Sequence, residues 1–302
     1  MLSGAVRTDF CLWMAGISSM YRNILIIVVF LLLLPRVSGA EGPVHVFASI
    51  LPEKNFIEKV GGGKVDVTIL LPPGRSPATY TPTPAQMAAL SHASIYFSIG
   101  VPFEKALLPK LRHEENMPEI VDITAGIARR GMTTPDLRGE PDPHVWLAPE
   151  NVRIMAGNIL DALSRLDPGN RKYYSENCMR FRKELDLLDK KLKKILAPFK
   201  GRKIYVFHPA FGYFASAYGM EQVAVETGGS SPSPRHIAEL IRMARRDRVR
   251  TIFVQPQFPS KSARTIADAI GGSVVPVDPL AEDYIGNMER LAGRMASSLE
   301  TP

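Results

Sequence analysis

The chain of 302 residues is poor in cysteine, with only Cys11 and Cys178. Cys11 lies in a segment that we expect to be removed, so the mature chain would keep one thiol and could form no internal disulfide. Cys178 falls on a regular apolar stripe, which favours a buried structural thiol over a reactive one.

The chain also lacks a basic stripe with interleaved aromatic residues. Its formal net charge is +7, from 37 basic and 30 acidic residues, and the basic residues are spread along the sequence. We interpret them as solvated helix faces and expect no nucleic-acid partner, because no nucleic-acid-binding module is recognisable. Apolar residues make up 45% and charged residues 22% of the chain, which is ordinary for a globular protein with a full core.

No apolar run reaches the roughly 20 residues that a membrane-spanning helix needs. The longest uninterrupted run covers residues 24–34, with Arg22 before it and Ser38–Ala40 after it. A basic start, a short apolar stretch and small residues at the end predict a secretory signal peptide, cleaved near Ala40, and export to the periplasm. An uncleaved anchor is the alternative. Met20 leaves open whether translation starts there or at Met1.

Short β-branched runs alternate with amphipathic segments in both halves of the mature chain. Strands are expected at residues 44–50, 65–71, 94–99, 119–123, 203–207, 222–225, 251–254 and 273–277. Helices are expected near residues 53–60, 84–91, 103–111, 233–246, 260–270 and 282–298. The alternation predicts an α/β fold with two parallel-sheet lobes of about four strands each.

A long helix is predicted between the two lobes, over residues 170–197. Its apolar positions alternate at spacings of four and three residues: Tyr174, Cys178, Phe181, Leu185, Leu188, Leu192 and Ile195. A helix of this length would reach about 40 Å and could run along both lobes. The predicted organisation is therefore a leader (1–40), an N-terminal lobe (41–169), a connecting helix (170–198) and a C-terminal lobe (199–302).

Two of the six histidines and one aspartate lie where ligand sites form. His144 follows a Gly- and Pro-rich loop (126–143), and His208 and Asp278 come directly after two predicted strands. Two imidazoles and a carboxylate from separate strand ends suit zinc, with manganese or iron possible. Taken singly, each histidine could be a hydrogen-bonded structural residue and Asp278 a turn residue.

Several motifs together resemble the zinc- and manganese-binding solute receptors of ABC importers. In chain order they are residues 70–74 (LLPPG), 99–104 (IGVPFE), 142–147 (DPHVWL), 207–215 (FHPAFGYFA), 231–234 (SPSP) and 277–280 (VDPL). The resemblance extends from about Val44 to Leu299. It implies two α/β lobes joined by a long helix, a divalent metal cargo in the cleft between them, and His144, His208 and Asp278 as its ligands. It also implies a membrane permease as partner, no enzymatic activity, and a monomer.

One position departs from this family pattern. Ala78 stands where the family usually has a ligand histidine, and its methyl group cannot bind metal. We expect three protein ligands, with water or one substitute oxygen ligand such as that of Glu226 or Tyr80 completing the shell; weak metal binding is the alternative. The histidine-rich acidic loop of many zinc-specific members is also absent. Outside transport, a metal-dependent hydrolase or a surface adhesin would be the competing function.

Overall fold

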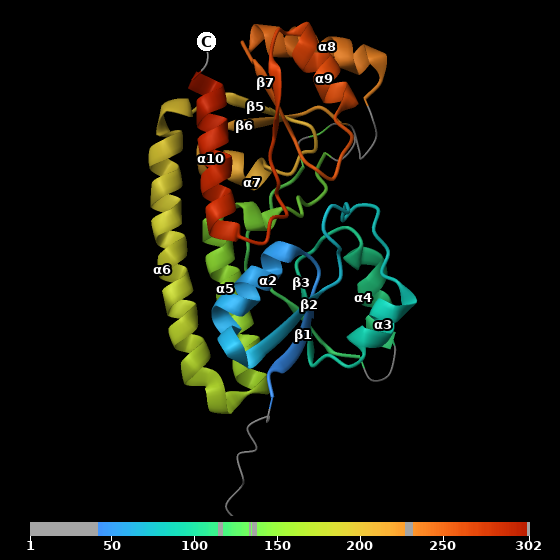
Figure 1. Ribbon diagram of the computed structural model, residues 1–302, viewed down its shortest axis with the longest axis vertical. Coiled ribbons are helices and arrows are strands. Elements are labelled where there is room, and N and C mark those ends of the chain that lie inside the picture. Colours follow the sequence, from blue (N-terminus) through green and yellow to red (C-terminus); the bar gives the residue numbers. More distant parts are fainter. Residues whose placement is uncertain (1–41, 114–116, 133, 135–137, 227–231, 301–302) are drawn as a thin grey trace, which may run out of the picture. The chain divides into compact units, whose positions relative to one another are not determined.

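The computed structural model describes residues 42–113, 117–132, 134, 138–226 and 232–300. Its first half forms a parallel sheet with strand order β2-β1-β3-β4 (Figure 1). The strands are β1 (Val44–Ala48), β2 (Val65–Ile69), β3 (Ile95–Ser98) and β4 (Glu119–Asp122). Three helices alternate with them, namely α2 (Leu51–Gly61), α3 (Pro84–Leu90) and α4 (Glu104–His113).

The second half repeats this plan with strand order β6-β5-β7-β8, again all parallel. Its strands are β5 (Lys203–Val206), β6 (Glu221–Ala224), β7 (Thr251–Val254) and β8 (Ser273–Pro276). Its helices are α7 (Gly212–Ala217), α8 (Pro234–Arg246), α9 (Lys261–Ala269) and α10 (Tyr284–Glu300). The prediction of two four-stranded parallel sheets is confirmed, and each predicted strand ends within two residues of the observed one.

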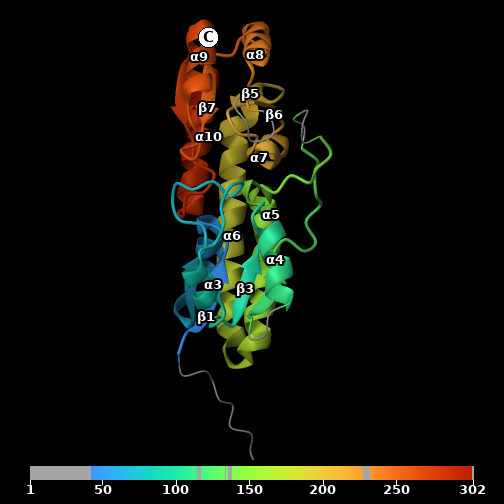
Figure 2. The ribbon, with the colours of Figure 1, turned by 90° about the vertical axis from the view of Figure 1, so that its right-hand side faces the viewer.

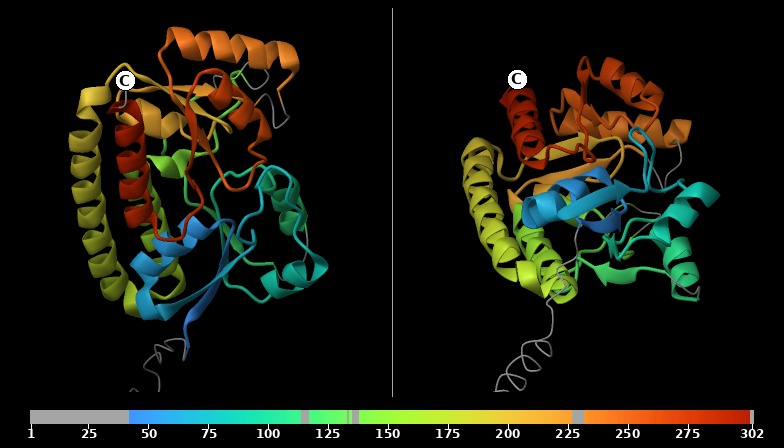
Figure 3. Two further views of the ribbon diagram at one scale, coloured as in Figure 1. Left: turned by 45° about the horizontal axis from the view of Figure 1, so that its top comes forward. Right: turned by 60° about the horizontal axis from the view of Figure 1, so that its bottom comes forward.

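The predicted long helix is confirmed as α6 (Arg171–Leu196), which follows a short 3₁₀ turn over Pro168–Asn170. Six of the seven predicted stripe positions are buried and Ile195 is partly buried, and Cys178 is only 1% exposed. α6 packs along α5 (Pro149–Leu166) and α2 from the first half and along α10 from the second. Figures 2 and 3 show α6 beside α5 and α10 in further views. α6 therefore contributes to a core shared by both halves.

The prediction omitted α5, which fills much of the stretch between the loop at 126–143 and α6. Its buried positions, Val152, Met155, Ala156, Ile159, Ala162 and Leu163, follow helical spacing, and Pro149 lies in its first turn. This signal was present in the sequence. The short helix α7 was also missed, because six residues give no readable period.

The loop at 126–143 has no helix or strand in its described part. It is held by isolated bridges, Gly131 to Pro141 and Met132 to Arg138, and by a bond from the Met132 amide to the Glu140 carbonyl. The predicted leader lies outside the described residues. Among the helices that the structure does describe, none has the length and apolar character needed to cross a membrane.

Candidate metal site

The carboxyl ends of the second sheet carry polar side chains on all four strands. Glu226, His208, Gln255 and Asp278 follow β6, β5, β7 and β8 within two residues of the strand ends. In a parallel sheet these ends share one edge, which is where open α/β proteins bind ligands. The His208 backbone is fixed by Gln255, whose Oε1 accepts from the His208 amide (3.0 Å) and whose Nε2 donates to the His208 carbonyl (2.8 Å).

The ring of His208 is held by a buried acid and an aromatic face. Its Nδ1 lies 2.5 Å from Oε1 of Glu226, which is 2% exposed. Phe258 stacks on the other side of the imidazole, with ring centroids 4.5 Å apart. Burial lowers the pKa of His208, although the hydrogen bond to Glu226 opposes that shift. His208 therefore favours the neutral form, which is the form that binds metal.

His144 has the same support from a different part of the chain. It precedes a 3₁₀ turn over Val145–Leu147, and its Nδ1 lies 2.8 Å from Oδ1 of Asp142. The same oxygen accepts the His144 backbone amide at 3.0 Å, so Asp142 fixes both the backbone and the ring. Asp142 is 1% exposed. A carboxylate on Nδ1 sets the tautomer that leaves Nε2 as the free donor atom.

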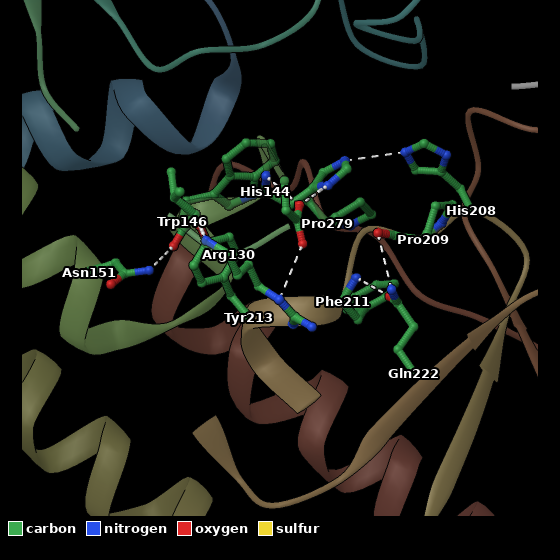
Figure 4. A network of polar contacts seen from close by, with 12 residues as sticks. Arg130, His144, Trp146, Asn151, His208, Pro209, Phe211, Tyr213, Gln222 and Pro279 are labelled. Carbon is green, nitrogen blue, oxygen red and sulfur yellow. Dashed lines mark hydrogen bonds and ion pairs between the residues drawn. The ribbon is translucent and has the colours of Figure 1, made fainter. Parts of the chain in front are cut away.

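The two imidazoles face each other through these free nitrogens (Figure 4). Nε2 of His144 and Nε2 of His208 lie 3.2 Å apart, across 64 residues of sequence. An ionised carboxylate only accepts hydrogen bonds, so Asp142 and Glu226 each draw a proton to Nδ1. If each Nδ1 donates to its carboxylate, the two Nε2 atoms face one another as possible acceptors, and a shared proton or a cation can lie between them.

The spacing of the two nitrogens also suits a metal ion. Zinc binds imidazole nitrogen at about 2.0–2.1 Å with tetrahedral geometry, so two such ligands stand about 3.3–3.4 Å apart. The observed 3.2 Å is close to this bite. The pair can accept a borderline-soft divalent cation with little movement of either ring.

Asp278, the third expected ligand, does not join this pair in the structure. Its Oδ1 accepts from Nε2 of Gln257 and from the Leu280 amide, both at 2.9 Å. Among the described residues, no three histidine, cysteine, aspartate or glutamate side chains are placed to hold one metal ion. The Asp278 segment still approaches the His144 segment, since Nε1 of Trp146 donates to the Pro279 carbonyl at 2.9 Å.

The residues considered as replacements for the missing histidine have other contacts. Ala78 is exposed, in the loop between β2 and α3. The Tyr80 hydroxyl lies 2.7 Å from the Leu70 carbonyl and 2.6 Å from Oε1 of Gln86. Glu226 lies on the Nδ1 side of His208, away from the nitrogen that faces His144. In this arrangement the Tyr80 hydroxyl and Oε1 of Glu226 are both committed to other partners.

Sequence reasoning missed that Asp142 supports the histidine two residues later, and it weighed Glu226 only as a ligand. Asp142 had a usable signal, because an acidic residue two positions before a candidate ligand can reach its ring. Its other oxygen, Oδ2, lies 3.9 Å from Nε of Arg130. A Cβ atom at Gly212 would come within 2.6 Å of that oxygen, so the glycine leaves room for the carboxylate.

The fold and the paired, acid-supported histidines define a class of two-sheet α/β proteins built to bind metal. Residues 46–298 match the family model described as "Zinc-uptake complex component A periplasmic" (ZnuA). The chain therefore belongs to this family. It is a metal-binding substrate-binding protein of the ABC metal importers, and the family is a transport component rather than an enzyme.

Solved structures and curated sequences agree with this assignment. A crystal structure of ZnuA is 38% identical, with a TM-score of 0.80, and the match covers 85% of this chain and 99% of that one. A zinc-bound ZnuA variant with residues 138–173 of its own sequence deleted is equally similar at 38% identity and 0.80, covering 85% and 98%. The manganese ABC transporter substrate-binding lipoprotein PsaA of Streptococcus mitis is 28% identical over 243 residues, or 76% of this chain and 77% of PsaA.

Proposed function

We propose that this protein captures Zn(II) outside the cytoplasm and delivers it to the membrane permease of an ABC importer. Mn(II) or Fe(II) is the alternative cargo. Zinc is favoured because the ZnuA structures, one of them zinc-bound, are 38% identical to this chain, whereas the manganese receptor PsaA is 28% identical. The borderline-soft imidazole pair is also better suited to zinc than to manganese.

The single observation that carries the proposal is the 3.2 Å separation of the two Nε2 atoms, with a buried carboxylate on each Nδ1. A structural histidine needs one partner and no particular tautomer. Here two histidines are both set to direct an unprotonated nitrogen at the same point, which is the requirement of a metal site.

Binding works by closure in this proposal. Residues 41–169 and 199–302 act as two lobes, and the stiff helix over 170–198 limits them to small tilts. His144 and His208 bind the ion first, and Asp278 joins as the third ligand when the lobes approach. The bound ion favours the closed arrangement because only that arrangement completes the ligand shell.

The proposed cellular location and membrane partner follow from the same family assignment. The leader over residues 1–40 directs export, and the mature chain works as a monomer in the periplasm, where the permease separates the lobes and releases the ion. PsaA is described as a lipoprotein, whereas residues 35–46, which follow the apolar run of this leader, contain no cysteine. A cleaved, unanchored form is therefore part of the proposal.

The test is metal uptake by the purified mature protein. Equimolar metal should be retained after dialysis, and the His144→Ala/His208→Ala double variant should retain none. His45→Ala is the matched control, because His45 pairs with Asp66 at 3.2 Å on the first sheet and has no part in the site. Metal content by mass spectrometry and competition titration identify the cargo. Full uptake by the double variant would refute the proposal.

A further inference from the structure

The site as proposed has two nitrogen donors and one carboxylate, so a further donor would strengthen it. Ala78 cannot provide one, the Tyr80 hydroxyl is bonded to the Leu70 carbonyl, and Oε1 of Glu226 is bonded to Nδ1 of His208. A candidate for this donor is the side chain beside Asp278. Gln257 lies in the segment after β7, and its Nε2 donates to Oδ1 of Asp278 at 2.9 Å.

The carbonyl oxygen of Gln257 is one of six buried side-chain polar atoms that have no hydrogen-bond partner among the described residues. Within the part of the chain that the structure describes, Oε1 of Gln257 is buried and unpaired. Leaving a buried acceptor unpaired is unfavourable, because the atom loses its hydrogen bonds to water and gains none in return. The amide cannot relieve this by flipping, since that would turn its oxygen toward the Asp278 carboxylate.

Gln257 and Asp278 together line a small cavity of about 70 Å³. The rest of its lining is apolar or backbone, from residues 51, 71–74, 280 and 281, so these two residues provide its polar side chains. A water molecule takes a share of about 30 Å³ in the liquid, so the cavity has room for an ion with a water. Residues 71–74 belong to the first half of the chain, so both halves contribute to this cavity.

The segment that carries Gln257 is also tied to His208. Gln255 brackets the His208 backbone and Phe258 stacks on its ring, so Gln257 lies between two residues that position the ligand. Gln257 is therefore connected to His208 through residues one or two positions away. The same segment contacts Asp278 directly.

We infer that Oε1 of Gln257 is an oxygen donor to the cargo ion, acting beside Asp278 and taking the place of the imidazole absent at Ala78. This inference rests on the proposed function. The donor set becomes two imidazoles, one carboxylate and one amide oxygen. Because carbonyl oxygen is a harder ligand than imidazole, Gln257 raises the tolerance of the site for Mn²⁺ relative to a site with three imidazoles.

The test compares Gln257→Leu, which removes both polar atoms, with Gln257→Glu, which keeps an oxygen donor but loses the amide N–H. Mn²⁺ and Zn²⁺ affinities are measured by competition titration, and the Co²⁺-loaded protein gives an absorption spectrum that reports ligand number. Gln257→Leu should weaken Mn²⁺ binding by about 10–100-fold, weaken Zn²⁺ binding less, and change the Co²⁺ spectrum. Gln257→Glu should bind Mn²⁺ within about threefold of the native protein.

Asn287→Ala is the matched control, because Nδ2 of Asn287 donates to the Asp278 carbonyl at 2.7 Å. It loosens Asp278 without removing a donor, so its Co²⁺ spectrum should stay native. The melting temperature of each metal-free variant confirms that it folds.

Two results would overturn the inference. One is a Gln257→Leu protein with native Mn²⁺ affinity and a native Co²⁺ spectrum. The other is a Gln257→Glu protein as weak as Gln257→Leu, which would mean that the amide only orients Asp278. Either result leaves the proposed function intact if the native protein binds metal and the double histidine variant does not. A native protein that binds no metal would refute the proposed function itself.

Discussion

Glu226 should contribute to metal affinity although it is not expected to touch the metal. Its carboxylate accepts from Nδ1 of His208 at 2.5 Å and is buried. In Glu226→Gln the amide oxygen can still accept that proton, so the ring keeps its place while the negative charge is lost. A charge-assisted hydrogen bond contributes about 1.5–3 kcal/mol and a neutral one about 0.5–1.5.

The difference of about 1–1.5 kcal/mol corresponds to a dissociation constant about ten times larger, at about 1.4 kcal/mol per factor of ten. Competition titration against a chelator of known affinity measures it at fixed pH. Glu239→Gln is the matched control, since Glu239 lies 3.8 Å from His236 and its side chain is 56% exposed. Native affinity in Glu226→Gln, or an equal loss in Glu239→Gln, would refute the reasoning that the carboxylate tunes His208.

Three further predictions concern pH, packing and the segment around Asp278. Acidification from pH 7.5 to 5.5 should weaken metal binding by about 10–100-fold, because protons compete with the metal for imidazole nitrogen in this range. The lowered pKa of His208 keeps the loss below the upper figure, and the folded apoprotein should also lose stability as pH falls, since the unfolded state binds that proton more readily. Titration at several pH values measures the affinity, and an affinity independent of pH in this range would contradict the prediction. Leu188→Ala, at a 2% exposed position of α6, should lower the free energy of unfolding by about 2–5 kcal/mol in urea denaturation. Leu187→Ala, at the neighbouring 58% exposed position, should lower the free energy of unfolding by less than about 0.5 kcal/mol, and equal losses in the two variants would contradict the assigned helix face. Trp146→Phe should cost about 1–3 kcal/mol by leaving the Pro279 carbonyl unpaired, and an unchanged denaturation midpoint would count against that bond.

The repeating pattern of the fold could be read from the sequence because it depends on local periodicity. Buried parallel strands are short β-branched runs, and α6 shows its apolar stripe at every turn. Seven of the eight strands were predicted one or two residues too long at their carboxyl ends, where the chain leaves the sheet. α5 was not predicted, although its buried positions follow the same helical spacing in the sequence.

The candidate metal ligands could also be predicted from the sequence, because a residue just past a parallel strand lies at the carboxyl edge of the sheet. The sequence by itself determined that His208 and Asp278 lie at the carboxyl ends of β5 and β8. Only the tertiary structure decided that Nε2 of His144 and Nε2 of His208 meet, with Asp142 and Glu226 behind them, and that Gln257 keeps an unpaired oxygen beside Asp278. Contacts between residues that are 64 positions apart depend on how loops cross and side chains pack, and no local spacing rule records that.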